Sequence, residues 1–188
     1  SGMNTNSEAN LKRDLRVNLK ARRDGANYDP NLAASLNVQL AELCLINGVK
    51  KIGCYLATAN EPDTELFIDW ALENGIEVLL PVANPDGSMH WIKFNGQTEI
   101  GIFGFAEAVG DAITADGIDV AIVPAMAVDR MGVRLGKGKG YYDRALKLIS
   151  PAPAVVAVIF DDELLDEIPA EAHDHPVDCA VTPTQTLH

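Results

Sequence analysis

The sequence predicts a three-layer α/β fold, in which a largely parallel sheet carries helices on both faces. Two nearly continuous apolar stretches, 119–127 and 154–160, are typical of strands that are covered on both faces of a sheet. Segments with helical periodicity alternate with such strands along the chain, as in folds where a helix crosses between parallel strands. Ligands of these folds bind at the carboxyl ends of the strands, so we expect the functional site there.

Helices are expected where the apolar spacing is helical and a residue suited to starting or stopping a helix stands at the end. Ser7 is expected to cap a first helix that runs to about Asp24. The second helix is expected to follow Pro30 and to end before Gly48. The stripe of the first helix that we expect to be buried consists of Leu11, Leu15 and Leu19.

The remaining elements follow the same reasoning. Thr64 is expected to cap a third helix that runs to about Asn74 and stops at Gly75, and a fourth helix is expected over 141–149. Trp91 and Phe94 lie at strand spacing and are interpreted as core residues. The expected strands are 51–57, 76–82, 89–94, 119–127, 154–160 and 179–182.

Length and composition indicate one domain over residues 1–188, since a domain has roughly 150 residues. Apolar residues make up 47% of the chain, yet no stretch approaches the ~20 apolar residues of a membrane span. Ser1-Gly2 ahead of Met3 resembles the remnant of a cleaved tag, and no signal peptide is evident. We therefore expect a cytoplasmic protein without a membrane partner. Without CxxC spacing, the cysteines are interpreted as buried thiols: Cys44, Cys54 and Cys179.

The charge is unevenly distributed. Lysine and arginine total 15 against 27 aspartate and glutamate residues, and the net charge of −12 argues against a general nucleic-acid binder. Residues 1–25 nevertheless carry six basic residues against three acids, and residues 130–147 carry six against Asp143 alone. Two basic segments in an acidic chain favour a small polyanionic ligand, although either segment is also compatible with a solvated helix face.

A glycine-rich segment, 129–143, follows a predicted buried strand and precedes a predicted helix. Backbone N–H groups and the helix dipole bind phosphate in this setting. Gly136, Gly138 and Gly140 alternate with other residues, which matches neither a Walker A loop nor a GxGxxG motif. Asp143 falls in the first helical turn, where it is placed either to hold Mg²⁺ or simply to complement the helix dipole.

Several segments together resemble the 5-formyltetrahydrofolate cyclo-ligase family, also called methenyltetrahydrofolate synthetases. The segment Arg134-Leu-Gly-Lys-Gly-Lys-Gly-Tyr-Tyr-Asp-Arg144 is similar to the signature loop of that family. The supporting segments are Lys12-x-x-x-Arg16, Tyr55–Thr64, Ile168-Pro and His173-Asp174. The chain departs from the family pattern at Ala108, where proline often follows the glutamate, and at Lys139, where many relatives have glycine.

The resemblance implies an ATP- and Mg²⁺-dependent cyclisation of 5-formyltetrahydrofolate to 5,10-methenyltetrahydrofolate, with release of ADP and phosphate. In this reaction the formyl oxygen is activated by phosphoryl transfer, so the protein supplies positioning and charge stabilisation and needs no nucleophile of its own. The resemblance also implies a fold like those of sugar-phosphate isomerases and CoA transferases. A monomer acting on folate with or without a polyglutamate tail is expected.

The site residues are those that the family pattern implies. Arg134, Lys137 and Tyr141 are implied to be catalytic, and Asp143 and Asp174 to hold Mg²⁺. The residues implied in folate binding are Leu56, Glu61, Phe103, Lys137 and Tyr141. The residues implied in ATP binding are Lys12, Arg16, Arg134, Leu135, Gly136, Lys137, Gly138, Lys139, Gly140, Tyr141 and Tyr142.

Some alternatives remain open from the sequence. Tyr141 is equally compatible with packing of its helix on the core, and Glu61 with an ordinary acid ahead of a helix. His173 and His175, with Cys179 nearby, lack the spacing of a four-ligand transition-metal site. The rival functions are a non-catalytic folate- or nucleotide-binding module and a sugar-phosphate isomerase-type enzyme, which fold alone does not distinguish.

Overall fold

The computed structural model describes residues 2–188, with side chains described from residue 7 onward; Ser1, part of the expected tag remnant, lies outside the described residues. An eight-stranded sheet runs through the centre, in the order β13-β12-β10-β7-β1-β2-β3-β6. The four central pairings, from β12 to β2, are parallel, whereas β13, β3 and β6 pair antiparallel at the two edges. Its strands are β1 (Lys51–Gly53), β2 (Glu77–Ala83), β3 (Met89–Lys93), β6 (Ala112–Ile113), β7 (Val120–Pro124), β10 (Ala154–Val158), β12 (Cys179–Val181) and β13 (Thr186–Leu187).

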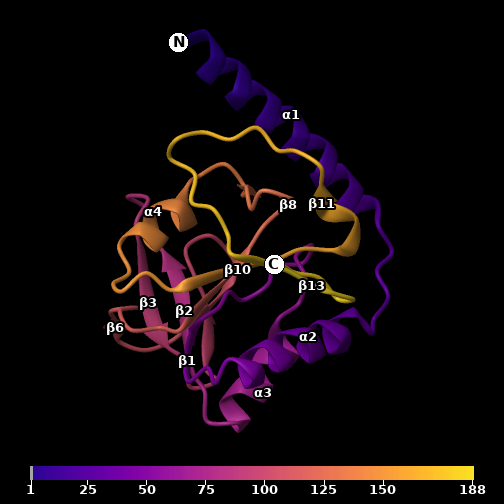
Figure 1. Cartoon of the computed structure of the whole chain (residues 1–188). Coiled ribbons are helices and arrows are strands. Elements are labelled where there is room, and N and C mark those ends of the chain that lie inside the picture. The colour runs from indigo at the N-terminus through magenta and orange to yellow at the C-terminus, as the bar shows by residue number, and fades with distance from the viewer. Residues whose placement is uncertain (1) are drawn as a thin grey trace.

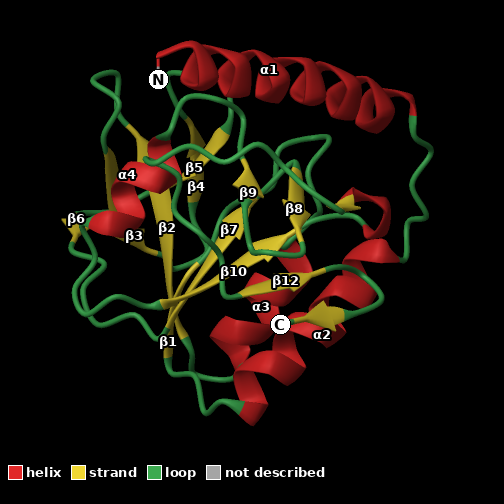
Figure 2. Ribbon diagram, turned by 45° about the horizontal axis from the view of Figure 1, so that its top comes forward, coloured by secondary structure: helices red, strands yellow, loops and turns green. Residues whose placement is uncertain are grey.

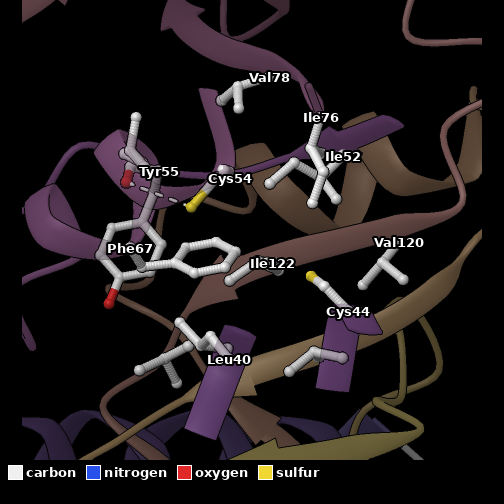
Figure 3. Packing of buried hydrophobic residues seen from close by; sticks show 14 of the residues in the cluster. Leu40, Cys44, Ile52, Cys54, Tyr55, Phe67, Ile76, Val78, Val120 and Ile122 are labelled. Carbon is white, nitrogen blue, oxygen red and sulfur yellow. Dashed lines mark hydrogen bonds between the residues drawn. The ribbon is translucent and has the colours of Figure 1, made fainter. Parts of the chain in front are cut away.

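Helices cover both faces of this sheet, as the sequence predicts. On one face, α2 (Leu32–Ile46) and α3 (Glu65–Glu73) pack on alternate side chains of the strands (Figures 1 and 3). On the other face, α4 (Tyr141–Lys147) packs on the remaining side chains through Leu146, followed by Ile149. Trp91 is 6% exposed and Phe94 packs against the core, which confirms both as core residues.

The long helix α1 (Gly2–Gly25) belongs to neither layer. It lies across the top of the molecule in Figure 2, above the segments that follow β7. There Leu19 packs with Met126, Ala127 and Leu135, which all come after the carboxyl end of β7. The position of α1 therefore places its inward face over the edge of the sheet where ligands of α/β folds bind.

Two expectations about α1 are wrong. The helix begins at Gly2, so Ser7 lies inside it and does not cap it. Leu11 is 54% exposed, whereas Lys12 is buried; Leu19 is buried as expected, and Leu15 packs partly buried against the same cluster. At its basic positions the inward face meets carboxylates and backbone carbonyls, with which buried cations pair.

Two further boundaries and one helix cap differ from the predicted ones. The strand expected over 51–57 ends at Gly53, because residues 55–64 close into a loop in which the Thr64 hydroxyl donates to the Tyr55 carbonyl at 2.6 Å. That hydroxyl therefore does not cap α3, although Thr64 stands at the capping position. The helix expected over 141–149 ends at Lys147. Gly75 ends α3 with a φ of +74°, as expected for glycine.

The strand expected over 119–127 is split. β7 ends at Pro124, and β8 (Ala127–Asp129) joins a separate small sheet with β9 (Arg134–Leu135) and β11 (Leu164–Leu165). At the break, arginine side chains rather than a neighbouring strand take the carbonyls of Pro124 and Ala125. A two-stranded hairpin, β4 (Thr98–Ile100) and β5 (Ala106–Ala108), was also not predicted.

The three cysteines are buried and unpaired, as predicted. Burial raises the pKa of Cys54 to about 12 and that of Cys44 to about 11, which keeps both thiols protonated at neutral pH. Among the described residues, no helix combines the length and the apolar character that crossing a membrane requires.

Candidate functional site

A cleft of about 680 Å³ lies at the carboxyl ends of β1, β2 and β7, beneath α1. Its walls come from α1, the loop after β1, the ends of β2 and β3, the tip of the β4–β5 hairpin, the glycine-rich segment, and residues 173–174. All but one of the residues implied in ATP, folate or Mg²⁺ binding line it; Leu135, fully buried beneath α1, does not. The lining residues that the sequence analysis did not single out as site residues include Arg23, Pro81, Ala83, Met89, Phe105 and Arg144.

The two basic segments of the sequence meet at this cleft. The Arg16 Nε donates to the Gly136 carbonyl at 2.8 Å, which joins α1 to the glycine-rich segment across 120 positions of sequence. Gly138 has a φ of +101°, and a Cβ there would lie 3.4 Å from the Arg16 guanidinium. Glycine therefore allows both the backbone conformation and the close approach of Arg16.

The inward face of α1 is basic along most of its length. Lys12, Arg16, Leu19 and Arg23 follow one another at spacings of four, three and four residues, which places them on one face of the helix. Lys12 and Arg23 are buried to 2% and 5% exposure, and Arg16 is half-buried. Cations with so little exposure need partners or ligands, because water solvates them poorly.

Lys12 is held by acids from the segment near the C-terminus. Its Nζ lies 2.6 Å from Asp174 Oδ2 and 3.0 Å from Glu171 Oε1. Arg16 differs, because within the described side chains no carboxylate lies within ion-pair distance of its guanidinium. Desolvation lowers the pKa of Arg16; the charges of Glu171 and Asp174 oppose this effect, and that of Arg134 adds to it. An anion bound in the cleft would further stabilise the charged guanidinium.

Arg134 crosses the floor of the cleft. One terminal nitrogen donates to the Pro124 carbonyl at 2.7 Å, and the other lies 3.5 Å from Asp143 Oδ1. Its buried Nε finds no acceptor among the described residues. The guanidinium also lies 5.7 Å from the centre of the Tyr142 ring, and burial raises the pKa of that phenol. Tyr142 is therefore a neutral aromatic wall rather than an acid.

Glu61 connects the loop after β1 with the glycine-rich segment. Its Oε1 accepts hydrogen bonds from both the backbone N–H and the hydroxyl of Thr58, each at 2.8 Å. Its Oε2 lies 3.5 Å from Lys137 Nζ, across the cleft. Leu56 is half-buried on the same loop. Glu61 is therefore more than an acid ahead of α3, since it lines the cleft and faces a cation of the opposite wall.

The aromatic residues of the cleft lie on two elements. Tyr141, at the start of α4, donates from its hydroxyl to the Asn84 carbonyl at 3.3 Å. Phe103 and Phe105 come from the tip of the β4–β5 hairpin and are 43% and 54% exposed. Lys139 Nζ lies 5.7 Å from the centre of the Phe103 ring, which links this hairpin to the glycine-rich segment.

Asp143 and Asp174, the candidate Mg²⁺ ligands, both line the cleft. Asp143 Oδ1 accepts from the His175 N–H at 3.1 Å, and Asp174 Oδ2 accepts from Lys12 and from the Glu171 N–H. Within the described residues, the second oxygen of each carboxylate accepts no hydrogen bond. Carboxylate oxygens are the ligands that Mg²⁺ prefers, so the chemistry of these two side chains fits this ion.

His173 and His175 are placed differently from the transition-metal arrangement considered in the sequence analysis. Ligand atoms of Glu171, His173 and Asp174 lie within 4.8 Å of one another. The imidazole of His175 instead faces the Pro176 carbonyl, and Cys179 is buried in β12.

Sequence reasoning missed several residues of the cleft, for different reasons. Arg23 continues the spacing of Lys12 and Arg16, so extending that stripe by two turns would have found it. Glu171 and Phe105 carry no motif, and only the folding of their loops brings them to the cleft.

Fold and cleft together define an α/β protein with a cation-lined ligand cleft at the carboxyl ends of its parallel strands. The model of the 5-formyltetrahydrofolate cyclo-ligase family matches residues 8–183, and the chain therefore belongs to that family of ligases. The 5-formyltetrahydrofolate cyclo-ligase of Mycolicibacterium smegmatis is 41% identical over 155 residues, which cover 76% of this chain and 80% of that protein. The enzyme of the same name from Mus musculus is 27% identical over 184 residues, covering 89% and 91%.

Solved structures agree with this assignment. The NMR structure of 5,10-methenyltetrahydrofolate synthetase from Aquifex aeolicus superposes with a TM-score of 0.81 at 28% identity, covering 94% of this chain and 92% of that one. A 5,10-methenyltetrahydrofolate synthetase from Mycoplasma pneumoniae, 21% identical, has the same fold with a TM-score of 0.71, covering 92% and 98%.

Proposed function

We propose that this chain converts 5-formyltetrahydrofolate to 5,10-methenyltetrahydrofolate, with ATP as co-substrate and Mg²⁺ as cofactor. Family membership supports the activity. The observation that carries the site assignment is the contact of Arg16 with the Gly136 carbonyl, since it brings both basic segments to one cleft. Residues 1–188 act as one domain in this proposal, because the two ends of the chain, through Lys12 and Asp174, meet in the site.

The reaction requires activation of an unreactive group. The N-formyl group is an amide, in which electron delocalisation makes oxygen the nucleophilic atom and leaves carbon a poor electrophile. The formyl oxygen attacks the γ-phosphorus of ATP, and ADP leaves. N10 of the folate then attacks the activated formyl carbon, N10 gives up its proton, and phosphate departs with the former formyl oxygen. Because the ring closes within one bound molecule, holding the folate bent lowers the barrier.

The cations of the cleft are proposed to stabilise the transferring phosphoryl group. Arg16, Arg134 and Lys137 all line the cleft, and the N–H groups of the glycine-rich segment are proposed as further donors. Arg134 lines the cleft beside Asp143 with its side chain almost fully buried, so its positive charge is little screened by water and suits the charge that develops on the phosphoryl oxygens. Lys12 holds Asp174 and Glu171 in place at the edge of this region.

The opposite part of the cleft is proposed to bind the pterin. The Glu61 carboxylate suits the N–H donors of a pterin edge, and Leu56 supplies an apolar wall beside it. Tyr141 and Phe103 flank the space beyond, where the formyl group and the aromatic ring of the folate would lie.

Asp143 and Asp174 would hold Mg²⁺ through the oxygens that accept no hydrogen bond. When bound, the ion supplies positive charge that neutralises the phosphate oxygens. The protein's contribution is to fix the two carboxylates, through the His175 N–H on Asp143 and through Lys12 on Asp174.

The test is to mix purified protein with 5-formyltetrahydrofolate and MgATP and to follow the near-UV absorbance of the methenyl product. An ATP-dependent rise is expected. Arg134→Ala should slow turnover by ~30- to 1000-fold, in line with ~2–4 kcal/mol for a lost oxyanion donor. Arg130→Ala is the control, since Arg130 is exposed and pairs only with Asp166. No signal in a protein that still binds folate would show the non-catalytic binding module instead.

A further inference from the structure

Arg144 lines the cleft at its β3 side and has no place in the phosphoryl-transfer machinery. We propose that Arg144 binds a carboxylate of the glutamate moiety of the folate. This inference rests on the proposed function, which supplies a substrate with a glutamate at one end.

The guanidinium of Arg144 is exposed but held in one orientation. One terminal nitrogen donates to the Gly87 carbonyl at 2.8 Å, and the guanidinium lies 5.6 Å from the centre of the Tyr141 ring. A Cβ at Gly140 would lie 2.8 Å from the other terminal nitrogen, so glycine leaves the room that this orientation needs. A long side chain fixed in advance loses less conformational entropy when it binds a ligand.

The positive charge of Arg144 is not neutralised by the protein. Within the described side chains, no carboxylate lies within 4.0 Å of its nitrogens. Arg16 and Lys139 also lack a carboxylate partner, but they belong to the walls proposed for the triphosphate. An oriented guanidinium without an acid partner favours a planar anion such as a carboxylate. The cleft cations that face a carboxylate within that distance are Lys12, Arg23, Arg134 and Lys137.

The order of side chains along the cleft matches the order of groups along a folate. Glu61 follows β1, Ala83 ends the neighbouring β2, and Met89 stands directly opposite Ala83 on β3. Arg144 lies beside the turn that joins β2 to β3, where it donates to the Gly87 carbonyl. The cleft thus has an acid on its β1 side, an apolar strip at the ends of β2 and β3, and a cation at the turn between them. A folate presents N–H donors, an aromatic ring and carboxylates in that sequence.

A second cavity, of about 520 Å³, continues past this point and shares Met89, Tyr141 and Arg144 with the cleft. Asp86 and Asp116 line it. Hydrogen bonds from Ser88 lower the pKa of Asp86, and one from the Ser150 N–H lowers that of Asp116, so both are anionic at neutral pH. These two anions would repel the carboxylates of a polyglutamate tail in the second cavity. The proposal is therefore limited to the first glutamate, at the boundary between the two cavities.

The experiment compares 5-formyltetrahydrofolate with the methylamide of 5-formyltetrahydropteroate (called the pteroate below), which keeps the amide carbonyl but carries no carboxylate. Equilibrium binding without ATP, together with KM and kcat, is measured for the wild type, Arg144→Gln and the control Arg130→Gln. The wild type and the control should bind the folate at least tenfold more tightly than the pteroate, which corresponds to ~1.4 kcal/mol. Arg144→Gln should bind the two compounds equally within about threefold, and its affinity for the pteroate should be unchanged.

If Arg144 has only a structural role, Arg144→Gln should lose affinity for both compounds to the same extent, and this outcome would overturn the proposal. So would an unchanged preference in Arg144→Gln, or a preference that disappears in Lys139→Gln instead. Circular dichroism establishes that each variant is folded, and Arg144→Lys, which keeps the charge, should retain part of the preference. Because binding is measured without turnover, the two proposals fail separately. If the wild type forms no methenyl product but shows the preference, and Arg144→Gln loses it, the enzyme is refuted and the carboxylate site is not.

Discussion

Replacing Arg23 by methionine should destabilise the protein strongly and weaken ATP binding. Arg23 donates to both oxygens of Glu163, at 2.7 Å each, and to the Ala125 carbonyl at 2.7 Å. The two side chains are 5% and 1% exposed. Burial opposes the charge of Arg23, but the hydrogen bonds and charge of Glu163 outweigh that effect, and the pKa of Arg23 is raised.

The magnitude follows from what remains after the substitution. Glu163 would be a buried carboxylate whose remaining hydrogen bond comes from the Phe160 N–H. Removing one partner of a buried ion pair lowers the free energy of unfolding by ~3–5 kcal/mol, a large fraction of the 5–15 kcal/mol that is typical of a whole protein. For a chain of this length that lowers Tm by ~6–20 °C. Since α1 also carries Lys12 and Arg16, KM for ATP should rise more than the KM for folate.

Urea unfolding, followed by circular dichroism, measures the free-energy change, and initial rates measure both KM values. The matched control is Arg22→Met on the same helix turn, because Arg22 and Asp162 are exposed and 3.5 Å apart, and such pairs contribute ~0–1 kcal/mol. Adding Glu163→Gln to Arg23→Met removes the unpaired charge and should recover at least half of the loss. If Arg23→Met costs no more than the control, or if the double variant is less stable than the single one, the reasoning is refuted.

Three further outcomes are expected. Gly138→Ala should raise KM for ATP severalfold, because alanine is strained at a φ of +101° and its Cβ would crowd Arg16; unchanged kinetics would contradict the assignment of this segment. Cys44 and Cys54 should react with iodoacetamide at pH 8 far more slowly in native than in urea-unfolded protein. Their folded pKa values of about 11 and 12 lie above that of an unfolded thiol. The free energy of unfolding that they contribute is therefore complete below ~pH 8.5 and declines as the pH rises beyond it. Urea titrations at pH 8 and pH 10 measure this decline. Asp143→Asn should sharply reduce turnover and raise the Mg²⁺ concentration needed for half-maximal rate, while circular dichroism stays native; a normal Mg²⁺ requirement would remove Asp143 as a ligand.

Patterns of consecutive residues were sufficient to predict the layered core. The apolar runs of β7 and β10 are buried on both faces, because an alternating set of side chains from each strand meets α2 and α3 on one side and α4 on the other. Strand and helix periodicity are properties of consecutive residues, so they are readable in the sequence. The glycine-rich segment and Gly75 were readable for the same reason, since a positive φ is a local demand.

The predictions failed where a distant segment decided the outcome. Leu11 was expected to be buried but is exposed, and Lys12 is buried instead because Glu171 and Asp174, some 160 positions away, face that side of α1. The strand expected over 119–127 breaks where Arg23 and Arg134 take its carbonyls. Nothing near Leu11 in the sequence indicates the first effect, whereas Pro124 was a local sign of the second, since proline has no N–H for a strand ladder.

By itself, the sequence determined the main strands and helices of the central layers and which charged residues and glycines the chain has available for binding a phosphate. The tertiary structure alone decided which face of α1 turns inward, that Arg23 pairs with Glu163, and that Arg144 ends up oriented without an acid partner. The physical reason is that backbone conformation depends on neighbours in sequence, whereas the environment of a charge depends on neighbours in space.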